Sequence, residues 1–348
     1  MNIPYRTQRV LNRVGTVLLV LLLVGIAAWL CWVLWLQRYV VYTDEGASLD
    51  FSQSSNDVVG EEAIPPVAEA NVSIFYNEGA NAIDTTNDLK QLSGYYITSD
   101  MVKEDYDNVL LQVERLSSGT PVMIEMKGPF GSFYYNTKLS GATISQSTDI
   151  AAYEALVSKM MSKGLYTIAQ ISSLRDREFG LNNVSSGLFL PSKIGLWADE
   201  AGMYWLDPTK SSTTTWISQV VMELKNMGFN EVMLADFCFP NSTAYLFEGD
   251  KTEALKSAAS TLLSTCGSSD FVLSFGVSDP TFTLPGERCR LYINAATAGN
   301  ISQVASQVTF EEPEVRLVFL ADSGDTRYDE YSVLRSIEIA EEMAARGY

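Results

Sequence analysis

Hydrophobic residues are arranged in two different patterns along this chain of 348 residues. Residues 14–36 form one apolar run without a charged side chain, and about 20 such residues span a bilayer as a helix. Arg6, Arg9 and Arg13 precede the run and the chain beyond it is acidic, so the positive-inside rule predicts a cytoplasmic N-terminus and an extracytoplasmic remainder. A cleaved signal peptide is the alternative, but the run is long and ends in bulky residues. We therefore expect a single-pass signal-anchor in the cell membrane, with residues 14–36 in the lipid bilayer.

The second pattern begins near residue 71, where short apolar segments alternate with amphipathic ones as far as the C-terminus. The stretch before it is acidic and rich in serine and contains Pro65-Pro66, which is typical of a tether. The sequence thus predicts a cytoplasmic tail, a transmembrane helix, an acidic linker and one extracytoplasmic domain, at residues 1–13, 14–36, 37–70 and 71–348.

Repeated units of a strand followed by a helix predict a parallel sheet covered by helices. The predicted strands are Tyr95–Thr98, Val122–Met126, Tyr166–Ile171, Glu231–Ala235, Phe271–Phe275, Leu291–Asn294 and Val315–Ala321. The predicted helices are Glu104–Ser117, Ile150–Lys163, Thr213–Met227, Glu253–Thr265, Ile301–Val308 and Tyr328–Arg346.

Seven predicted strands are one fewer than a closed TIM-like (β/α)8 barrel requires. An open edge would leave unpaired backbone groups, and Val72–Tyr76 reads as a spare strand, so we expect this segment to close the barrel. A doubly wound open sheet is the alternative α/β fold. It is weakened because no G-x-G-x-x-G motif or P-loop follows any predicted strand.

The amino-acid composition excludes several classes of catalytic site and of binding partner. The chain has no histidine, which excludes Ser/His and Cys/His hydrolases and His-ligated zinc enzymes and leaves carboxylates for acid–base work. No metal site and no cofactor are predicted. Four of the 24 Lys+Arg lie at or before Arg38 and no acidic residue does, so 20 remain against 42 Asp+Glu beyond it. Such a domain does not bind nucleic acid through a general field.

Three cysteines lie beyond the predicted membrane helix, at Cys238, Cys266 and Cys289. This number does not suggest a disulfide scaffold. One bridge between Cys266 and Cys289 is an open alternative, and isolated buried thiols are favoured.

Several segments together resemble a known family. They are Gly94-Tyr95-Tyr96, Val122 to Lys127, Gly164 to Ile171 with Leu174-Arg175-Asp176, and Trp205-Leu206-Asp207-Pro208 with Gly228 to Pro240. In order and spacing they resemble bacterial domains described as putative glycoside hydrolases with an amylase-like barrel. The resemblance implies a (β/α)8 fold, a carbohydrate partner and catalytic carboxylates at the C-terminal ends of the strands.

The chain departs from this family at two positions. Gln170 stands where the third strand usually carries arginine. The acid that usually follows the fourth strand falls on Ala235, and Asp236 comes one residue later. Successive strand residues point to opposite faces, so the shift moves a carboxylate from the barrel mouth to its wall unless a bulge restores it.

Candidate catalytic carboxylates follow or end the predicted strands: Asp236, Glu125, Asp279 and Asp322. Candidate substrate-binding residues lie in the same strands or in the long connection over residues 172–207: Lys127, Gln170, Arg175, Asp176, Trp197, Trp205 and Phe237. Structural roles are open alternatives for several of them. Glu125 and Lys127 form a candidate ion pair, Asp176 lies between two arginines, and the tryptophans are candidates to anchor the long connection. Asp207 before Pro208 is typical of a helix cap.

Two functions remain open from the sequence. One is a glycoside hydrolase that acts on a glycan with a pair of carboxylates. The other is a degenerate barrel that binds a glycan or an envelope protein without turnover. Two carboxylates facing one groove beside aromatic rings favour the enzyme, whereas Asp236 turned into the wall favours binding.

Overall fold

The computed structural model describes residues 40–43, 46–49, 89–293 and 297–345. The span predicted at residues 14–36 and the strand predicted at Val72–Tyr76 lie outside these residues. Over the described part of the chain, no helix has the length and apolarity needed to cross a membrane. The chain divides into two units, Met1–Asn81 and Ala82–Tyr348. In the first unit, β1 (Val40–Thr43) and β2 (Gly46–Leu49) pair antiparallel.

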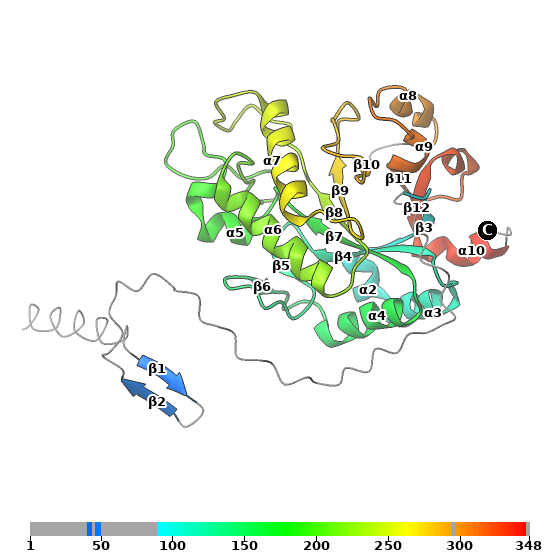
Figure 1. Cartoon of the computed structure of the whole chain (residues 1–348), viewed down its shortest axis with the longest axis horizontal. Helices are drawn as coiled ribbons and strands as arrows, with labels where there is room; N and C mark the ends of the chain where they lie inside the picture. Colours follow the sequence, from blue (N-terminus) through cyan, green and yellow to red (C-terminus); the bar gives the residue numbers. More distant parts are fainter. Residues whose placement is uncertain (1–39, 44–45, 50–88, 294–296, 346–348) are drawn as a thin grey trace, which may run out of the picture. The chain divides into compact units, whose positions relative to one another are not determined.

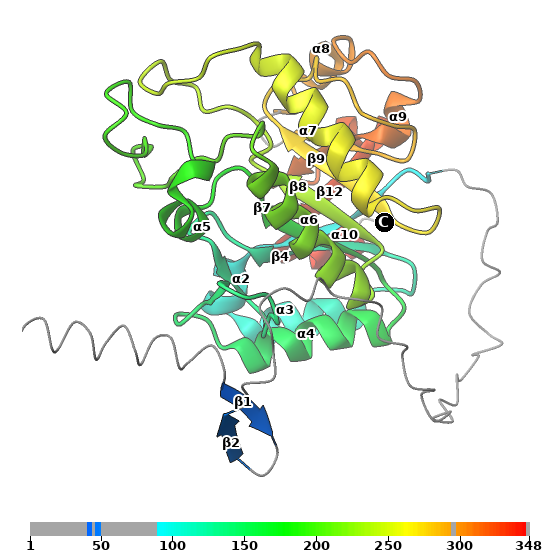
Figure 2. The same ribbon diagram turned by 60° about the vertical axis from the view of Figure 1, so that its left-hand side comes forward.

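The second unit is a closed barrel of eight parallel strands (Figures 1 and 2). The strands are β3 (Ser93–Ile97), β4 (Pro121–Lys127), β7 (Tyr166–Ser172), β8 (Glu231–Ala235), β9 (Val272–Val277), β10 (Leu291–Ile293), β11 (Leu317–Ala321) and β12 (Ser332–Ser336). Around the barrel their order is β3, β4, β7, β8, β9, β10, β11 and β12, and β12 pairs with β3 to close it. Two short strands, β5 (Ser132–Phe133) and β6 (Thr143–Ile144), extend the sheet beside β4. The predicted TIM-like fold is confirmed.

The predicted source of the eighth strand is wrong. The place beside β3 is taken by β12, which lies inside the helix predicted at Tyr328–Arg346. This strand was not recognised because Arg335 interrupts its apolar pattern. The Arg335 side chain is buried nonetheless, and its Nη2 lies 2.6 Å from Oδ1 of Asp329. Asp329 is only six residues earlier in the chain, but the apolar pattern does not reveal that the two side chains pair when Arg335 is buried.

The strands separate two apolar cores. Their side chains alternate between the lumen of the barrel and its outer wall. The lumen core is formed by Leu92, Met123, Ile168, Met233, Ala235, Tyr292, Val318 and Leu334. A larger core between the outer wall and the helices holds the other strand faces, including Val122, Ile124 and Phe275.

Helices cover the outer wall, as Figures 1 and 2 show. The longer ones are α3 (Tyr106–Arg115), α4 (Ile150–Ser162), α6 (Ser211–Asn226) and α7 (Lys251–Cys266). Shorter ones are α2 (Ser99–Glu104), α5 (Arg177–Asn182), α8 (Ile301–Ala305), α9 (Pro313–Arg316) and α10 (Ala340–Ala345). The single-turn helices are η2 (Val184–Ser186), η3 (Thr326–Glu330) and η4 (Ile337–Ile339).

Capping side chains explain why two of the long helices begin where they do. Asp149 accepts the backbone N–H of Ala152 ahead of α4, and Asp250 accepts those of Thr252 and Glu253 ahead of α7. Such caps satisfy backbone donors that have no partner inside the helix.

The bounds predicted from the sequence for α4, α6 and α7 agree with the structure to within two residues at each end.

The three cysteines of the second unit are free thiols. Cys266 and Cys289 are buried, and Cys238 is half-buried. No bridge joins them, which was the favoured expectation.

Candidate functional site

The C-terminal ends of the strands form the mouth of the barrel, where (β/α)8 enzymes keep their active sites. The long connection after β7 covers part of this mouth. It is held to itself by isolated β-bridges between Arg175 and Trp205, Gly187 and Leu206, and Ala198 and Tyr204. The connection is therefore an ordered layer of the described structure.

A groove of about 800 Å³ lies at this mouth beside the ends of β7, β8 and β9. We call it the mouth groove. It is lined by Arg175, Trp197, Ala198, Asp199, Glu200, Ala201, Trp205, Cys238, Phe239, Pro240, Asn241, Ser242 and Ser278. Three of the residues predicted to bind substrate, Arg175, Trp197 and Trp205, are among them.

Asp199 fixes one side of the mouth groove. Its Oδ2 accepts hydrogen bonds from Nε of Arg175 at 2.7 Å and from Nε1 of Trp205 at 3.1 Å. Burial raises the pKa of Asp199, but the hydrogen bonds from Met203 and Trp205 and the charge of Arg175 outweigh it, and the net shift is downward. Asp199 therefore stays ionised and neutralises Arg175, which also lies over the Trp205 ring.

Aromatic rings form another part of the mouth groove and of the layer behind it. The rings of Trp197 and Tyr245 lie 5.4 Å apart, and those of Phe239 and Tyr245 lie 6.3 Å apart and nearly parallel. Nζ of Lys251 lies 4.6 Å from the centre of the Tyr245 ring. These contacts anchor the rings, and they also leave Trp197 and Phe239 half-buried on the groove wall.

Asp236 follows the last residue of β8 in an uncommon backbone conformation. Its φ is +53°, in the left-handed region, which non-glycine residues adopt rarely and mostly at functional sites or turns. Oδ2 of Asp236 accepts a hydrogen bond from Oγ of Ser172 at 2.6 Å, and the residue is half-buried. Ala235 before it belongs to the lumen core. The acid is therefore displaced from the lumen position, as the sequence suggested, but it is not buried in the wall.

Cys238 links Asp236 to the mouth groove. Burial and the charge of Asp236 raise the pKa of Cys238 to about 11, while Ser278 and Arg175 act in the opposite direction. Cys238, Ser278 and Arg175 all line the groove. Oγ of Ser172 lies 2.6 Å from Oδ2 of Asp236 and 2.7 Å from the carbonyl oxygen of Arg175, a residue of the groove. This shared neighbour places the Asp236 carboxylate next to the groove.

Two further candidate carboxylates, one near the end of β4 and one after β11, each accept a single hydrogen bond. Oε2 of Glu125 accepts the backbone N–H of Ser99 at 3.0 Å. Oδ1 of Asp322 accepts the hydroxyl of Tyr96. For Glu125, Asp236 and Asp322, no described residue donates a hydrogen bond to the second carboxylate oxygen. Three of the four candidate catalytic acids therefore combine a fixed position with an open oxygen.

Asp279, the fourth candidate, lies in an exposed turn after β9. Its Oδ1 accepts hydrogen bonds from the backbone N–H and the hydroxyl of Thr281. This capping role accounts for its position. Within the described residues, no three carboxylate or cysteine side chains gather closely enough to hold a metal ion.

Lys127 and Asp176 are placed away from the groove, in a buried ion pair of 2.8 Å. Asp176 also accepts hydrogen bonds from the indole of Trp216 and from the backbone N–H of Phe179. The open alternative for Glu125 is therefore not realised, because Lys127 pairs with Asp176. Both buried residues have a structural role, and we leave them out of the proposed site.

Two other predicted substrate-binding residues, Phe237 and Gln170, do not line the mouth groove. Phe237 is fully buried in the outer core, where its ring packs on Phe275 at 4.9 Å, so it cannot reach a ligand in the groove. Gln170 is half-buried, pairs in register with Glu125 and follows the lumen-facing Ile168 by two residues. Its side chain therefore faces the lumen below the mouth.

A buried polar network inside the barrel was not expected from the sequence. The Glu231 carboxylate pairs with Arg290 and accepts hydrogen bonds from the hydroxyls of Tyr166, Ser274 and Tyr292, at 2.9, 2.6 and 2.8 Å. Burial lowers the pKa of Arg290, but Glu231 more than restores it, and the net shift is upward. A charged residue at the start of a strand that is otherwise apolar was the available signal. Its partners lie up to 65 residues away in sequence.

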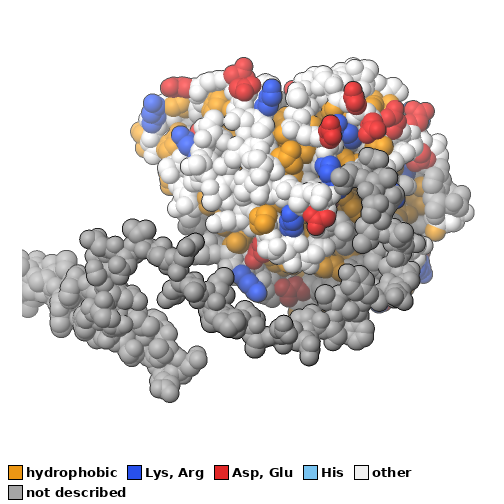
Figure 3. Space-filling model, in the orientation of Figure 1, with side chains coloured by type: hydrophobic (Ala, Val, Ile, Leu, Met, Phe, Trp, Pro, Cys, Tyr) orange, Lys and Arg blue, Asp and Glu red, His pale blue; other side chains and the backbone are white. Residues whose placement is uncertain are grey.

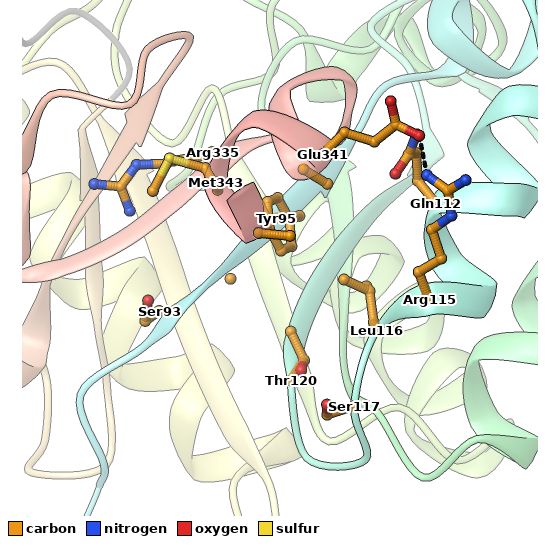
Figure 4. A pocket seen from close by; sticks show the side chains of 13 residues that line it. Ser93, Tyr95, Gln112, Arg115, Leu116, Ser117, Thr120, Arg335, Glu341 and Met343 are labelled. Atoms are coloured by element: carbon orange, nitrogen blue, oxygen red, sulfur yellow. Dashed lines mark hydrogen bonds and ion pairs between the residues drawn. The ribbon is translucent and has the colours of Figure 1, made fainter. Parts of the chain in front are cut away.

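Another hollow, of about 370 Å³, lies near the N-terminal ends of β3 and β4 (Figure 4). Side chains of β3, α3 and α10 line it, and Arg115 and Glu341 form an ion pair across it. Residues at this end of a (β/α)8 barrel serve stability rather than catalysis. We therefore do not assign it to the active site.

Comparison with known proteins now identifies the family. A family model described as "Putative glycosyl hydrolase domain" matches residues 94–267. The match covers half of the chain, from β3 to the end of α7. The chain belongs to this family. The family region contains the whole set formed by Glu125, Asp236 and the long connection, but not Asp322.

Solved structures share the fold with this family member. The GH36 α-galactosidase of Geobacillus stearothermophilus has a TM-score of 0.50 and 9% identity, over 75% of this chain and 41% of that chain. The α-galactosidase of Lactobacillus brevis has a TM-score of 0.51 and 7% identity, over 75% and 40%. The chain thus spans about two fifths of these enzymes, and the likeness shows the barrel fold alone. No curated protein matches the sequence.

Proposed function

We propose that this barrel is a glycoside hydrolase that binds a glycan in the mouth groove and uses Asp236 as one of two catalytic carboxylates. The proposal rests on the backbone conformation and the hydrogen bonding of Asp236. Its left-handed backbone sets the carboxylate beside the groove, Ser172 holds one oxygen, and the other has no donor among the described residues. Strained backbone conformations cluster at active sites because the surrounding structure must hold the reactive group.

Glu125 is the proposed partner of Asp236. Only β7 separates β4 from β8, so the two strands lie about 10 Å apart in the sheet. Glu125 is level with Met233, three residues before Asp236, so its side chain has to reach toward the mouth to approach Asp236. Glycoside hydrolases place their two carboxyl groups about 5 to 10 Å apart, depending on stereochemistry. One group protonates the glycosidic oxygen as the bond to the leaving sugar breaks. The other attacks the anomeric carbon or removes a proton from the attacking water.

The groove walls support a carbohydrate as the ligand. Trp197 and Phe239 offer partly exposed rings, on which the C–H faces of sugars stack. Asn241, Ser242 and Ser278 offer uncharged donors and acceptors for sugar hydroxyls. Such a combination of rings and a few polar groups is typical of small-molecule sites.

Asp236→Asn tests the proposal, because it removes the charge with little change in shape. We expect the folded variant to keep its glycan affinity and to lose kcat by at least about a thousandfold. Glu125→Gln should lose rate similarly. Asp279→Asn, which changes an exposed carboxylate at the same mouth, is the matched control and should retain activity. Turnover that survives in Asp236→Asn would reject Asp236 as a catalytic residue.

A second candidate function is glycan binding without turnover. It is favoured by Ala235, which occupies the lumen position where the resemblance places the acid. In this case the wild-type protein binds oligosaccharides but releases no reducing ends. Asp236→Asn then changes affinity or stability only.

We also propose that residues 14–36 anchor the barrel in the cell membrane with the N-terminus in the cytoplasm. The uncharged run and the arginines before it support this arrangement. Protease added to intact spheroplasts should then remove the domain that follows residue 40. Full protection of residues 71–348 would contradict it.

A further inference from the structure

A second groove lies on the outside of the barrel, between α5, α6 and the segment that follows β5. Its volume is about 540 Å³, and none of the residues that line it carries a charge. We call it the lateral groove. In Figure 3 the surface over α5 and α6 is mainly white, the colour of backbone and of uncharged polar side chains. The mouth groove, by contrast, contains Arg175, Asp199 and Glu200.

Two stacked rings form the apolar part of the lateral groove. The rings of Phe179 and Trp216 lie 4.8 Å apart and are inclined by 11°. Asp176 fixes both, because it accepts the indole N–H of Trp216 at 3.1 Å and the backbone N–H of Phe179 at 2.9 Å. Lys127 in turn pairs with Asp176. The ring pair is thus positioned before any ligand arrives, which lowers the entropic cost of binding.

Uncommitted polar groups surround the rings. Asn182 on α5 and Thr215 and Gln219 on α6 are exposed, and their side chains form no hydrogen bond with another described residue. Amides and hydroxyls both donate and accept hydrogen bonds, which is also true of sugar hydroxyls. A neutral sugar matches this surface, whereas an anion or a cation finds no charged partner among the lining residues.

We propose that the lateral groove is an accessory binding site for neutral oligosaccharides, separate from the mouth groove. One sugar ring lies against the partly exposed Phe179 ring, and its hydroxyls contact Asn182, Thr215 and Gln219. This site retains a glycan chain on the side of the barrel and does not depend on hydrolysis at the mouth.

The test uses the full-length chain with Asp236→Asn, so that no ligand is consumed. The probes are maltohexaose, cellohexaose and chitohexaose, with hexagalacturonate as the anionic counterpart. Hydrogen–deuterium exchange should show that at least one neutral probe protects residues 177–183 and 211–219. The double variant Asn182→Ala with Gln219→Ala should weaken this protection by at least about tenfold in ligand concentration. Gln303→Ala on α8, an exposed glutamine outside the groove, is the matched control and should change nothing.

Trp197→Ala separates the two sites, because it alters the mouth groove only. Protection of residues 211–219 should persist in this variant. Three results would overturn the proposal: no neutral probe protects the lateral groove, protection survives the double variant, or hexagalacturonate binds there equally well. If the wild type hydrolyses glycans but no probe protects residues 211–219, the proposed function is supported and the lateral site is rejected. If a probe protects these residues but the wild type hydrolyses no glycan, the lateral site is supported and the proposed function is rejected.

Discussion

At the scale of single residues, the partners of each carboxylate decide what it can do. Glu231 is fully buried and receives every hydrogen bond that its two oxygens need, so it serves the structure. Asp236 is half-buried, has one donor and lies beside a groove. Glu231 begins β8 and Asp236 directly follows it, so burial and partners, and not the choice of strand, distinguish the two carboxylates.

Glu231→Gln should destabilise the protein strongly. The substitution leaves Arg290 buried without a counter-charge, and breaking a buried pair in this way costs about 3–5 kcal/mol. Urea denaturation of the variant should show this loss, while Glu248→Gln at an exposed position should not. The double variant Glu231→Leu with Arg290→Met removes both charges, so we expect it to be more stable than Glu231→Gln. An unchanged unfolding midpoint in Glu231→Gln would refute the structural role.

Cys238 reports the charge of its neighbour Asp236. Burial first, and then the negative charge of Asp236, raise the pKa of Cys238 to about 11, so at pH 8 the thiol is almost entirely protonated. Asp236→Asn removes the negative charge, which should lower this pKa and increase the thiolate fraction. Alkylation by iodoacetamide at pH 8, followed by mass spectrometry of the Cys238 peptide, should therefore be faster in the variant. Asp279→Asn is the control, and equal rates in wild type and Asp236→Asn would show that the two side chains do not interact.

At the scale of elements, β12 completes the barrel although its sequence favours a helix. It pairs with β11 on one side and β3 on the other. The polar ends of the strand find buried partners, since Oγ of Ser332 donates to the carbonyl oxygen of Val315 at 2.8 Å. A strand closed on both sides has no free edge, and the fold gains its stability from that closure.

Val333→Pro should therefore open the barrel. The backbone N–H of Val333 donates to the carbonyl oxygen of Leu92 at 2.8 Å, and proline removes this donor. Proline also leaves the buried carbonyl oxygen of Leu92 without its donor, and the loss should be about 1–3 kcal/mol. Val333→Ala keeps the N–H and serves as the control for the lost side chain. Equal melting temperatures of the two variants would show that β12 pairing contributes little.

At the scale of the whole molecule, the charge distribution predicts which glycans the proposed site should disfavour. The chain carries a net charge of −18. Arg175, a cation of the mouth groove, is neutralised by Asp199, while Glu200 and Asp236 lie in or beside the same groove without such a partner among the described residues. An anionic sugar entering this groove is repelled, because a cleft focuses the field of its charged walls.

Anionic oligosaccharides should bind the mouth groove less tightly than neutral ones of the same length. We expect hexagalacturonate to bind at least about tenfold more weakly than its methyl ester at low salt. The difference should shrink at about 1 M salt, where the screening length falls to about 3 Å. Calorimetric titration of Glu125→Gln, which keeps the charges of Glu200 and Asp236, at two salt concentrations measures both effects, and tighter binding of the free acid would contradict the charge argument.

The sequence by itself determined the features that depend on local patterns. Strand and helix periodicity predicted seven of the eight strands and the long connection over the mouth, because side-chain alternation is written in neighbouring residues. The absence of histidine restricted acid–base chemistry to carboxylates. The family resemblance predicted the family and the barrel, and it directed attention to Asp236 and Glu125 as candidate residues.

Only the tertiary structure decided which buried polar and charged side chains pair with each other. Arg335 and Ser332 are compatible with a strand because residues elsewhere satisfy them when buried. Asp176 and Lys127 are buried because they pair with each other, and Asp176 also accepts the indole N–H of Trp216. Glu231 meets Arg290 from 59 residues away. No local pattern encodes such pairings, since the free energy of a buried polar group is set by whichever atoms the complete fold brings beside it.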